Sequence, residues 1–134
     1  GKLEIFREGK DVAIIVCGHL VYEALLAAEE LAKEKISVLV ANNHTIKPID
    51  KKTIIEIAKL TGALVTVEDH QIMGGMGSAV AEVLVKNYPV PMEMIGIQDR
   101  HGQSGQPDEL IKEYSLDSCS IKKAVKKVLS RKLS

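Results

Sequence analysis

Aromatic side chains are scarce in this sequence, and their scarcity excludes some functions. Tryptophan is absent, phenylalanine occurs once, and all aromatic residues together make up 3% of the chain. Proteins that bind single-stranded nucleic acid stack its bases on aromatic rings, so this composition argues against such a partner. Apolar runs such as VAIIVC are far shorter than the roughly 20 residues that a transmembrane helix needs. We therefore expect a soluble, cytoplasmic protein that binds neither nucleic acid nor membranes.

Cysteine is also rare, and the sequence lacks the spacings that are typical of metal sites. Its two cysteines, Cys17 and Cys119, lie far apart, and no CxxC pair occurs. The four histidines form no HxH or HExxH pattern. We interpret the cysteines as structural thiols and expect no metal site.

The charge is balanced overall but uneven along the chain. The 134 residues carry a formal net charge of zero, yet every charged residue after Ser120 is basic. The apolar residues of this segment follow the spacing of one helical face: Ile121, Ala124, Val125, Val128 and Leu129. The segment is therefore predicted to be a docked helix with a solvated basic face, rather than an arm for nucleic acid.

Strand and helix patterns alternate along the rest of the chain. Strands are expected at residues 3–6, 11–18, 37–41, 63–68 and 92–97, and helices at 21–32, 51–61, 78–86, 109–114 and the C-terminal segment. Asp50 is predicted to cap the helix at 51–61 and Gly62 to end it in a left-handed turn. We divide the chain into a linker or entering strand (1–10) and one α/β domain (11–134). Such alternation predicts a mainly parallel sheet covered by helices on both faces.

The candidate functional residues lie in loops at the carboxyl ends of the expected strands, where ligands of such sheets usually bind. We single them out as interface or anion-binding positions, with no catalytic residue among them: Glu68, Asp69, His70, Gly74, Gly75, Gly77, Ser78, Arg100, His101 and Ser104. The stretch "VEDHQIMGGMGSAV" contains GxG, but Val80 stands where a dinucleotide fingerprint has its third glycine. We interpret these glycines as a structural strand-to-helix turn, with an anion at the turn as a hypothesis. Ser104 in "GQSGQ" does not match a GxSxG hydrolase elbow.

Four ordered motifs resemble the C-terminal domain of transketolases: "REGKDVAIIVCG", "TIKPID", "VTVEDHQIMGGMGSAVAEVL" and "GQSGQPDELIKEYSLD". Related domains occur in deoxyxylulose-phosphate synthase and in the beta subunits of 2-oxo acid dehydrogenases. The resemblance implies a three-layer α/β/α domain with a mixed, mainly parallel five-stranded sheet. It also implies a parent enzyme that uses thiamine diphosphate and Mg, moves a two-carbon ketol unit between sugar phosphates, and forms a homodimer.

The same resemblance implies that other domains hold the cofactor, through a GDG-type motif. This sequence has no GD dipeptide, so we expect the domain to bind no cofactor and to be inactive alone. Its expected partners are the remaining transketolase domains or a separate N-terminal subunit, and its expected role is assembly, with binding of a regulatory ligand as a further suggestion. Two other classes stay open: a synthase or dehydrogenase C-terminal domain, which in the dehydrogenases docks another component, and a free-standing phosphate or nucleotide module that uses Glu68 to Gly77. We expect Glu68 and His70 to make polar contacts across a boundary with a neighbouring domain or subunit.

Overall fold

The computed structural model describes residues 2–44, 49–98 and 107–132, with side chains from residue 117 onward in the last segment. The described chain alternates strands and helices as the sequence predicts. In chain order the elements are β1 (Leu3–Arg7), β2 (Val12–Cys17), η1 (Gly18–Leu20), α1 (Val21–Lys33), β3 (Val38–Asn43), α2 (Lys51–Thr61), β4 (Leu64–Asp69), η2 (His70–Ile72), α3 (Gly75–Asn87), β5 (Met92–Ile97) and α4 (Pro107–Arg131). Among these described elements, no helix combines the length and the apolar character needed to cross a membrane.

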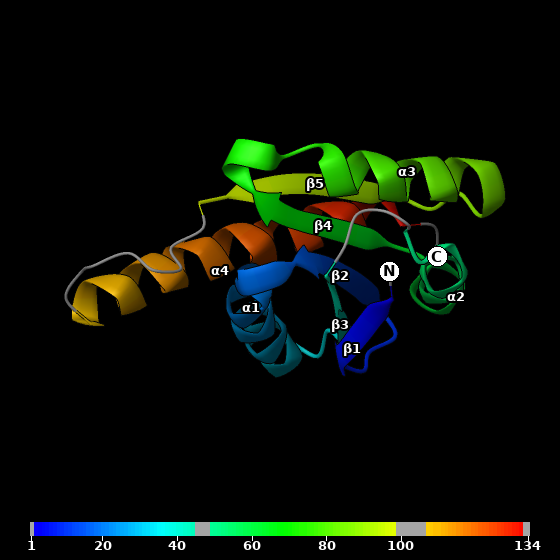
Figure 1. The fold of residues 1–134 in the computed structure, drawn as a ribbon. Helices are drawn as coiled ribbons and strands as arrows, with labels where there is room; N and C mark the ends of the chain where they lie inside the picture. Colours follow the sequence, from blue (N-terminus) through cyan, green and yellow to red (C-terminus); the bar gives the residue numbers. More distant parts are fainter. Residues whose placement is uncertain (1, 45–48, 99–106, 133–134) are drawn as a thin grey trace.

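The strands form one mixed sheet between two layers of helices. The strand order is β1-β3-β2-β4-β5. β1 pairs antiparallel with β3, and all other neighbours are parallel. Helices α1 and α4 cover one face, whereas α2 and α3 cover the other (Figure 1). The expected three-layer fold with a mixed five-stranded sheet is confirmed.

The central strand β2 explains why its sequence is an uninterrupted apolar run. Ile14 and Val16 belong to the core beneath α1 and α4, whereas Ala13 and Ile15 belong to the core beneath α2 and α3. All four side chains are fully buried. A strand covered on both faces needs apolar residues at every position rather than at alternate ones.

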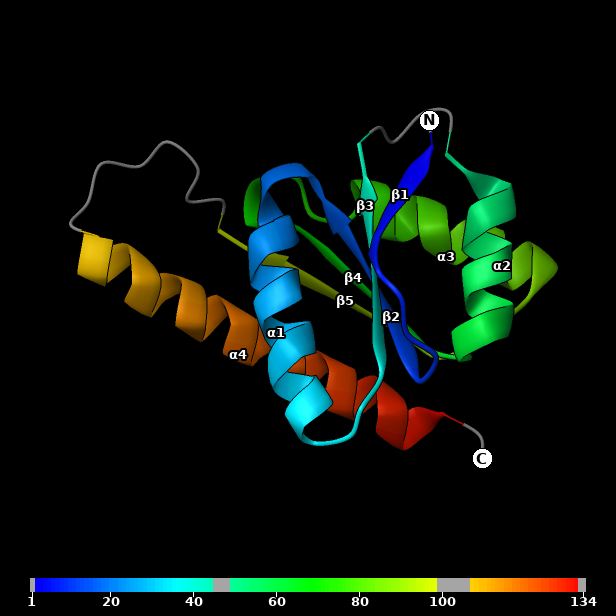
Figure 2. The same cartoon turned by 90° about the horizontal axis from the view of Figure 1, so that it is seen from below.

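Helix α4 corrects the expectation of a short helix at 109–114 followed by a separate terminal helix. It runs without a break from Pro107 to Arg131 (Figure 2). The segment between the two predicted helices, "SLDSCS", contains Ser and Asp residues, which favour caps over helix interiors. No glycine or proline follows Pro107 within the helix, so no residue there prevents the backbone hydrogen bonds from continuing.

The C-terminal half of α4 docks as its apolar spacing predicts. Ile121, Val125 and Val128 are fully buried in the core shared with α1. Its basic face, however, also contacts the end of α1, because Lys126 Nζ lies 2.7 Å from Oε1 of Glu34, the C-cap residue of α1. Both side chains of this pair are largely exposed, so the apolar contacts contribute most of the docking energy.

The ends of α2 follow the predicted capping residues. Asp50 Oδ1 accepts a hydrogen bond from the Thr53 N–H at 3.2 Å. Its Oδ2 accepts a second one from the Leu3 N–H at 3.0 Å, which fixes the start of β1 to the start of α2. Gly62 ends the helix with φ 74°, and its N–H donates to the Ala58 carbonyl. Both predicted caps are therefore confirmed.

Asp50 should make stability depend on pH. Burial raises the pKa of this carboxyl, but the hydrogen bonds from Leu3 and Thr53 outweigh burial and leave the pKa below its usual value. A lowered folded-state pKa gives stability that is present above the unfolded pKa of about 3.9 and is lost as the pH falls through the folded value. Asp50→Asn keeps the cap but removes the negative charge at the start of α2, so it should lower the free energy of unfolding by about 0.3–1 kcal/mol at neutral pH, and by progressively less below about pH 4.

Urea denaturation at a series of pH values measures this difference. Glu56→Gln, at an exposed acid on the same helix, is the matched control and should change little. A deficit of Asp50→Asn that stays constant down to pH 3, about one unit below the unfolded pKa, would contradict the prediction.

Candidate functional site

The turn between β4 and α3 contains most of the predicted site residues. After β4 the chain makes the short helix η2 and reaches Gly74, whose φ of 108° favours glycine. Helix α3 then begins at Gly75, three residues before the predicted start at Ser78. The prediction placed the start too late because Gly75 and Gly77 are poor helix formers. Contacts with β4 stabilise this first turn despite them.

Glu68 provides the main contacts of that turn. Its carboxylate is buried, with 1% of the residue exposed. Oε1 accepts a hydrogen bond from the Met76 N–H at 2.8 Å, and Oε2 accepts from the N–H groups of Gly74 and Gly77 at 3.0 Å each. The first N–H groups of a helix have no partner within it, and the helix dipole favours a negative charge beside them. Glu68 thus acts as an internal anion that holds the N-terminus of α3.

This arrangement bears on the hypothesis of an anion at the turn. The backbone donors that would bind a phosphate already bind the Glu68 carboxylate. A second anion beside this buried charge would also be repelled. The turn therefore does not fit the diphosphate of a thiamine cofactor. The expectation that Glu68 makes contacts across a domain boundary is corrected, since its side chain points into the domain.

Gly77 allows α3 to approach the sheet closely. A Cβ atom at this position would lie 2.5 Å from Met94 Cε, 3.0 Å from Glu68 Oε2 and 3.1 Å from Thr66 Oγ1. The interpretation of the glycines as a structural turn is therefore confirmed in two ways. Gly74 supplies the positive φ, and Gly77 supplies the close helix packing.

The other predicted site residues are dispersed. Asp69 Oδ1 accepts a hydrogen bond from the Gln71 N–H at 2.9 Å and so caps η2, whereas His70 is exposed on η2 and Ser78 is exposed on α3. The predicted positions Arg100, His101 and Ser104 lie outside the described residues. Within residues 2–44, 49–98 and 117–132, no three His, Cys, Asp or Glu side chains are grouped to hold a metal ion.

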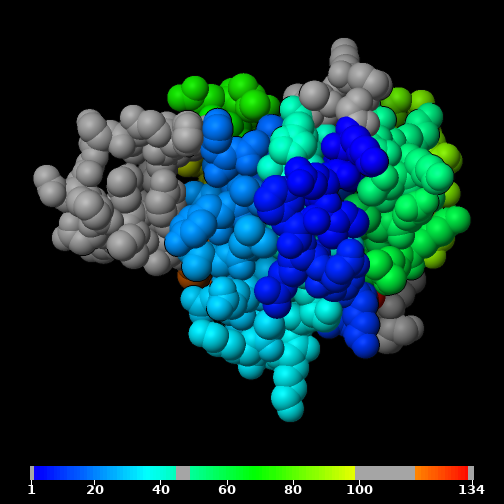
Figure 3. All heavy atoms as spheres, turned by 60° about the horizontal axis from the view of Figure 1, so that its bottom comes forward, coloured from blue at the N-terminus to red at the C-terminus, as the bar shows by residue number. Residues whose placement is uncertain are grey.

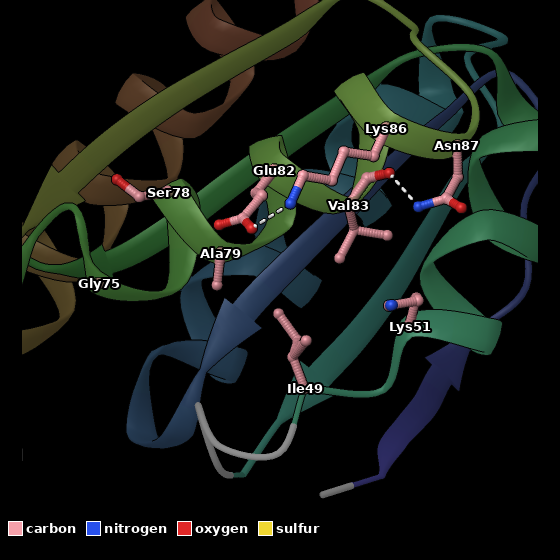
Figure 4. A pocket seen from close by; sticks show the side chains of 9 residues that line it. All are labelled: Ile49, Lys51, Gly75, Ser78, Ala79, Glu82, Val83, Lys86 and Asn87. Atoms are coloured by element: carbon pink, nitrogen blue, oxygen red, sulfur yellow. Dashed lines mark hydrogen bonds and ion pairs between the residues drawn. The ribbon is translucent and has the colours of Figure 1, made fainter.

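A groove between the start of α2 and the outer side of α3 was not predicted from the sequence. Figure 4 shows this groove from close by. Its volume is about 400 Å³. The groove is lined by Ile49, Lys51, Gly75, Ser78, Ala79, Glu82, Val83, Lys86 and Asn87. Only Gly75 and Ser78 were among the predicted site residues. The remaining residues come together through the packing of two helices that are distant in sequence, and no short motif marks that arrangement.

The chemistry of this groove suits binding rather than catalysis. Ile49, Ala79 and Val83 give it an apolar component, and Figure 4 shows Ile49 and Ala79 pointing toward one another. Glu82 and Lys86 form an ion pair of 2.9 Å on α3, and the hydrogen bond from Lys86 lowers the pKa of Glu82. The lining includes Ser78, but no hydrogen bond joins its hydroxyl group to Glu82, Lys51 or Lys86 among the described residues, so the groove shows no paired nucleophile and base.

The structure is thus a three-layer α/β/α domain. In its turn between β4 and α3, the Glu68 carboxylate binds the backbone N–H groups at the start of the helix. Comparison with known proteins places this domain in a family. Residues 1–121 match the family described as "Transketolase, C-terminal domain". The chain therefore belongs to the transketolase C-terminal domain family.

Similar proteins support this assignment along almost the whole chain. The 6-deoxy-6-sulfo-D-fructose transketolase subunit SqwH of Clostridium sp. (strain MSTE9) is 45% identical over 132 residues, which are 98% of this chain and 41% of that protein. The 1-deoxy-D-xylulose-5-phosphate synthase 1 of Geobacter metallireducens is 42% identical over 90% of this chain and 20% of its own length. A solved structure described as "Split gene transketolase, inactive beta4 tetramer" superposes with a TM-score of 0.81 at 42% identity, over 98% of this chain and 43% of that one. The chain thus spans less than half the length of these relatives.

Proposed function

We propose that this chain is the assembly domain of a cytoplasmic, thiamine-diphosphate-dependent transketolase. The parent enzyme transfers a two-carbon ketol unit between sugar phosphates, as in the pentose phosphate pathway. The observation that carries the proposal is the match of nearly the whole chain to less than half of a protein named as a transketolase subunit. The rest of the parent supplies the catalytic machinery.

The interior of the domain supports the proposal that this chain serves assembly and that other domains bind the cofactor. The one glycine-rich helix start in the described chain is occupied by the Glu68 carboxylate, so thiamine diphosphate and Mg are held by other domains. The partners of this chain are the remaining transketolase domains or a separate N-terminal subunit, in a homodimeric parent. The similar split-gene protein is described as an inactive β4 tetramer, which supports the view that such a part needs its partner for activity.

A second candidate is the C-terminal domain of a deoxyxylulose-phosphate synthase. The similarity to the Geobacter synthase at 42% identity favours it. The sequence "MGGMGS" at the start of α3 also resembles the synthase branch more closely than the transketolase branch. In both the transketolase and the synthase this domain would have the same assembly role. The two parent enzymes would differ in the reaction product that they form.

The test is an assay of the parent protein with thiamine diphosphate and Mg. Transfer of a ketol unit from a ketose phosphate to an aldose phosphate is the expected result. Formation of 1-deoxy-D-xylulose 5-phosphate instead would replace the transketolase assignment with the synthase. Calorimetric titration of the separate chain should show no micromolar binding of thiamine diphosphate with Mg, and such binding would overturn the division of labour.

A further inference from the structure

We infer that the groove between α2 and α3 is the seat for the polypeptide that precedes Gly1 in the parent enzyme. This inference rests on the proposed function, because it requires a parent that extends beyond this domain. It identifies the surface through which the domain is held in that parent. Two observations on the described residues and one on the relatives support it.

The first observation is where the chain enters the domain. Asp50 lies between two groove residues, Ile49 and Lys51, and its carboxylate binds the Leu3 N–H at 3.0 Å. The start of β1 is therefore fixed to the wall of the groove. Figure 3 shows β1 on the molecular surface beside α2, and Figure 4 shows the start of β1 near Ile49 and Lys51. A polypeptide that leads into β1 reaches the groove without crossing the rest of the domain.

The second observation is the chemistry of the groove. Ile49, Ala79 and Val83 offer apolar surface to an occupant. The Lys51 side chain is exposed and has no hydrogen bond or salt bridge to any described residue, although its charge is near enough to Glu82 to help lower the pKa of that carboxyl. Lys86 is already paired with Glu82. We therefore expect the occupant to contain an apolar side chain next to an acidic one. The apolar side chain would be buried in the groove, and the carboxylate would pair with Lys51.

The third observation is the length of the relatives. The chain spans 41% of the sulfofructose transketolase subunit and 43% of the split-gene structure. Because the matched family is a C-terminal domain, the additional residues of such proteins precede the matched part. A covalently attached segment also has a high local concentration at the groove, which favours it over a separate ligand.

Photo-cross-linking in the full-length parent tests the inference. A photoreactive amino acid replaces Ala79 inside the groove, and the control replaces Val85, which is on the same helix, 73% exposed and outside the lining. Copies with and without ¹⁵N are mixed, so that mass spectrometry separates cross-links within one polypeptide from those between copies. Position 79 should cross-link to a peptide that precedes Gly1 in the same polypeptide, and position 85 should not.

Charge variants give a second reading of the same experiment. Lys51→Glu should reduce the cross-link from position 79 several-fold, whereas Lys52→Glu, outside the lining, should leave it unchanged. If the probe at 79 prevents folding, the probe is moved to Ser78, which is exposed and lines the same groove, and the same cross-link is expected. A cross-link to residues 2–132 of another copy, a cross-link to a different protein, or no cross-link from either position would overturn the inference.

Activity of the same preparation separates this inference from the proposed function. Ketol transfer without the cross-link would overturn the groove as the seat and leave the transketolase assignment in place. The cross-link without ketol transfer would overturn the assignment and support the seat.

Discussion

Replacing Glu68 with alanine should destabilise the domain by about 3–5 kcal/mol, because removal of a buried, hydrogen-bonded charge is among the costliest single substitutions. Three backbone N–H groups at the N-terminus of α3, from the N-cap residue Gly74 and from Met76 and Gly77, bind this carboxylate at 2.8–3.0 Å. Without it, at least the buried donors of Met76 and Gly77 lose their acceptor and have no access to water. The start of α3 should then unfold locally, and the packing of α3 against β4 should weaken.

Chemical denaturation measures this loss, and two variants separate its causes. Glu68→Gln keeps the shape and one oxygen acceptor but removes the charge, so it should cost about 2 kcal/mol. Asp69→Ala removes the neighbouring carboxylate, whose hydrogen bond to Gln71 is exposed, and should cost about 1 kcal/mol or less. Equal effects of Glu68→Ala and Asp69→Ala would contradict the role of Glu68 as the internal anion of this turn.

Gly77→Ala should destabilise the domain by about 2–3 kcal/mol through overpacking. The added methyl group would lie 2.5 Å from Met94 Cε and 3.0 Å from Glu68 Oε2. Met94 can move the end of its side chain, but Glu68 is fixed by its three hydrogen bonds. The steric cost opposes the intrinsic preference of helices for alanine over glycine, which is worth about 1 kcal/mol.

Gly77→Ala should lower stability, whereas alanine at an uncrowded helical glycine should not, so the two kinds of site can be told apart. Gly75→Ala is the matched control, because Gly75 lies in the same helical turn, is exposed and lacks a positive φ. It should leave stability unchanged or raise it by up to about 1 kcal/mol. Both free energies of unfolding come from the same denaturant titration. A Gly77→Ala variant as stable as Gly75→Ala would show that α3 does not need its close approach to β4.

The parts of the fold that depend on residues close together in the sequence could be predicted from the sequence. The uninterrupted apolar run of β2 indicates a strand buried on both faces, and the structure buries it so. Asp50 and Gly62 mark the ends of α2, because a cap depends on residues within one turn. The four ordered motifs also indicated the family that the comparison then showed.

The two errors in helix boundaries share one physical cause. Intrinsic propensity predicted a later start for α3 and a break in α4, at glycines in one case and at a Ser and Asp cluster in the other. Tertiary contacts outweighed propensity at both places, through the Glu68 carboxylate and through burial of Asp117 and Ser118 beside the core.

The candidate site was the least predictable part. Glu68, Asp69 and His70 are neighbours in sequence, yet the first is buried, the second caps η2 and the third is exposed. The direction of each side chain depends on the path of the turn, which Gly74 and the position of α3 determine. The groove was missed for a related reason, since its surface exists only once α2 and α3 have packed together.

The docked half of α4 also determines when this domain can finish folding during synthesis. Ile121, Val125 and Val128 complete the core on the α1 face of the sheet, and they leave the ribosome after all five strands. Until they do, an apolar face of the sheet that includes Val65 and Val67 lacks one of its two covering helices. Chains whose translation stops before this helix would therefore expose an aggregation-prone surface, and they would become substrates for chaperones and proteases.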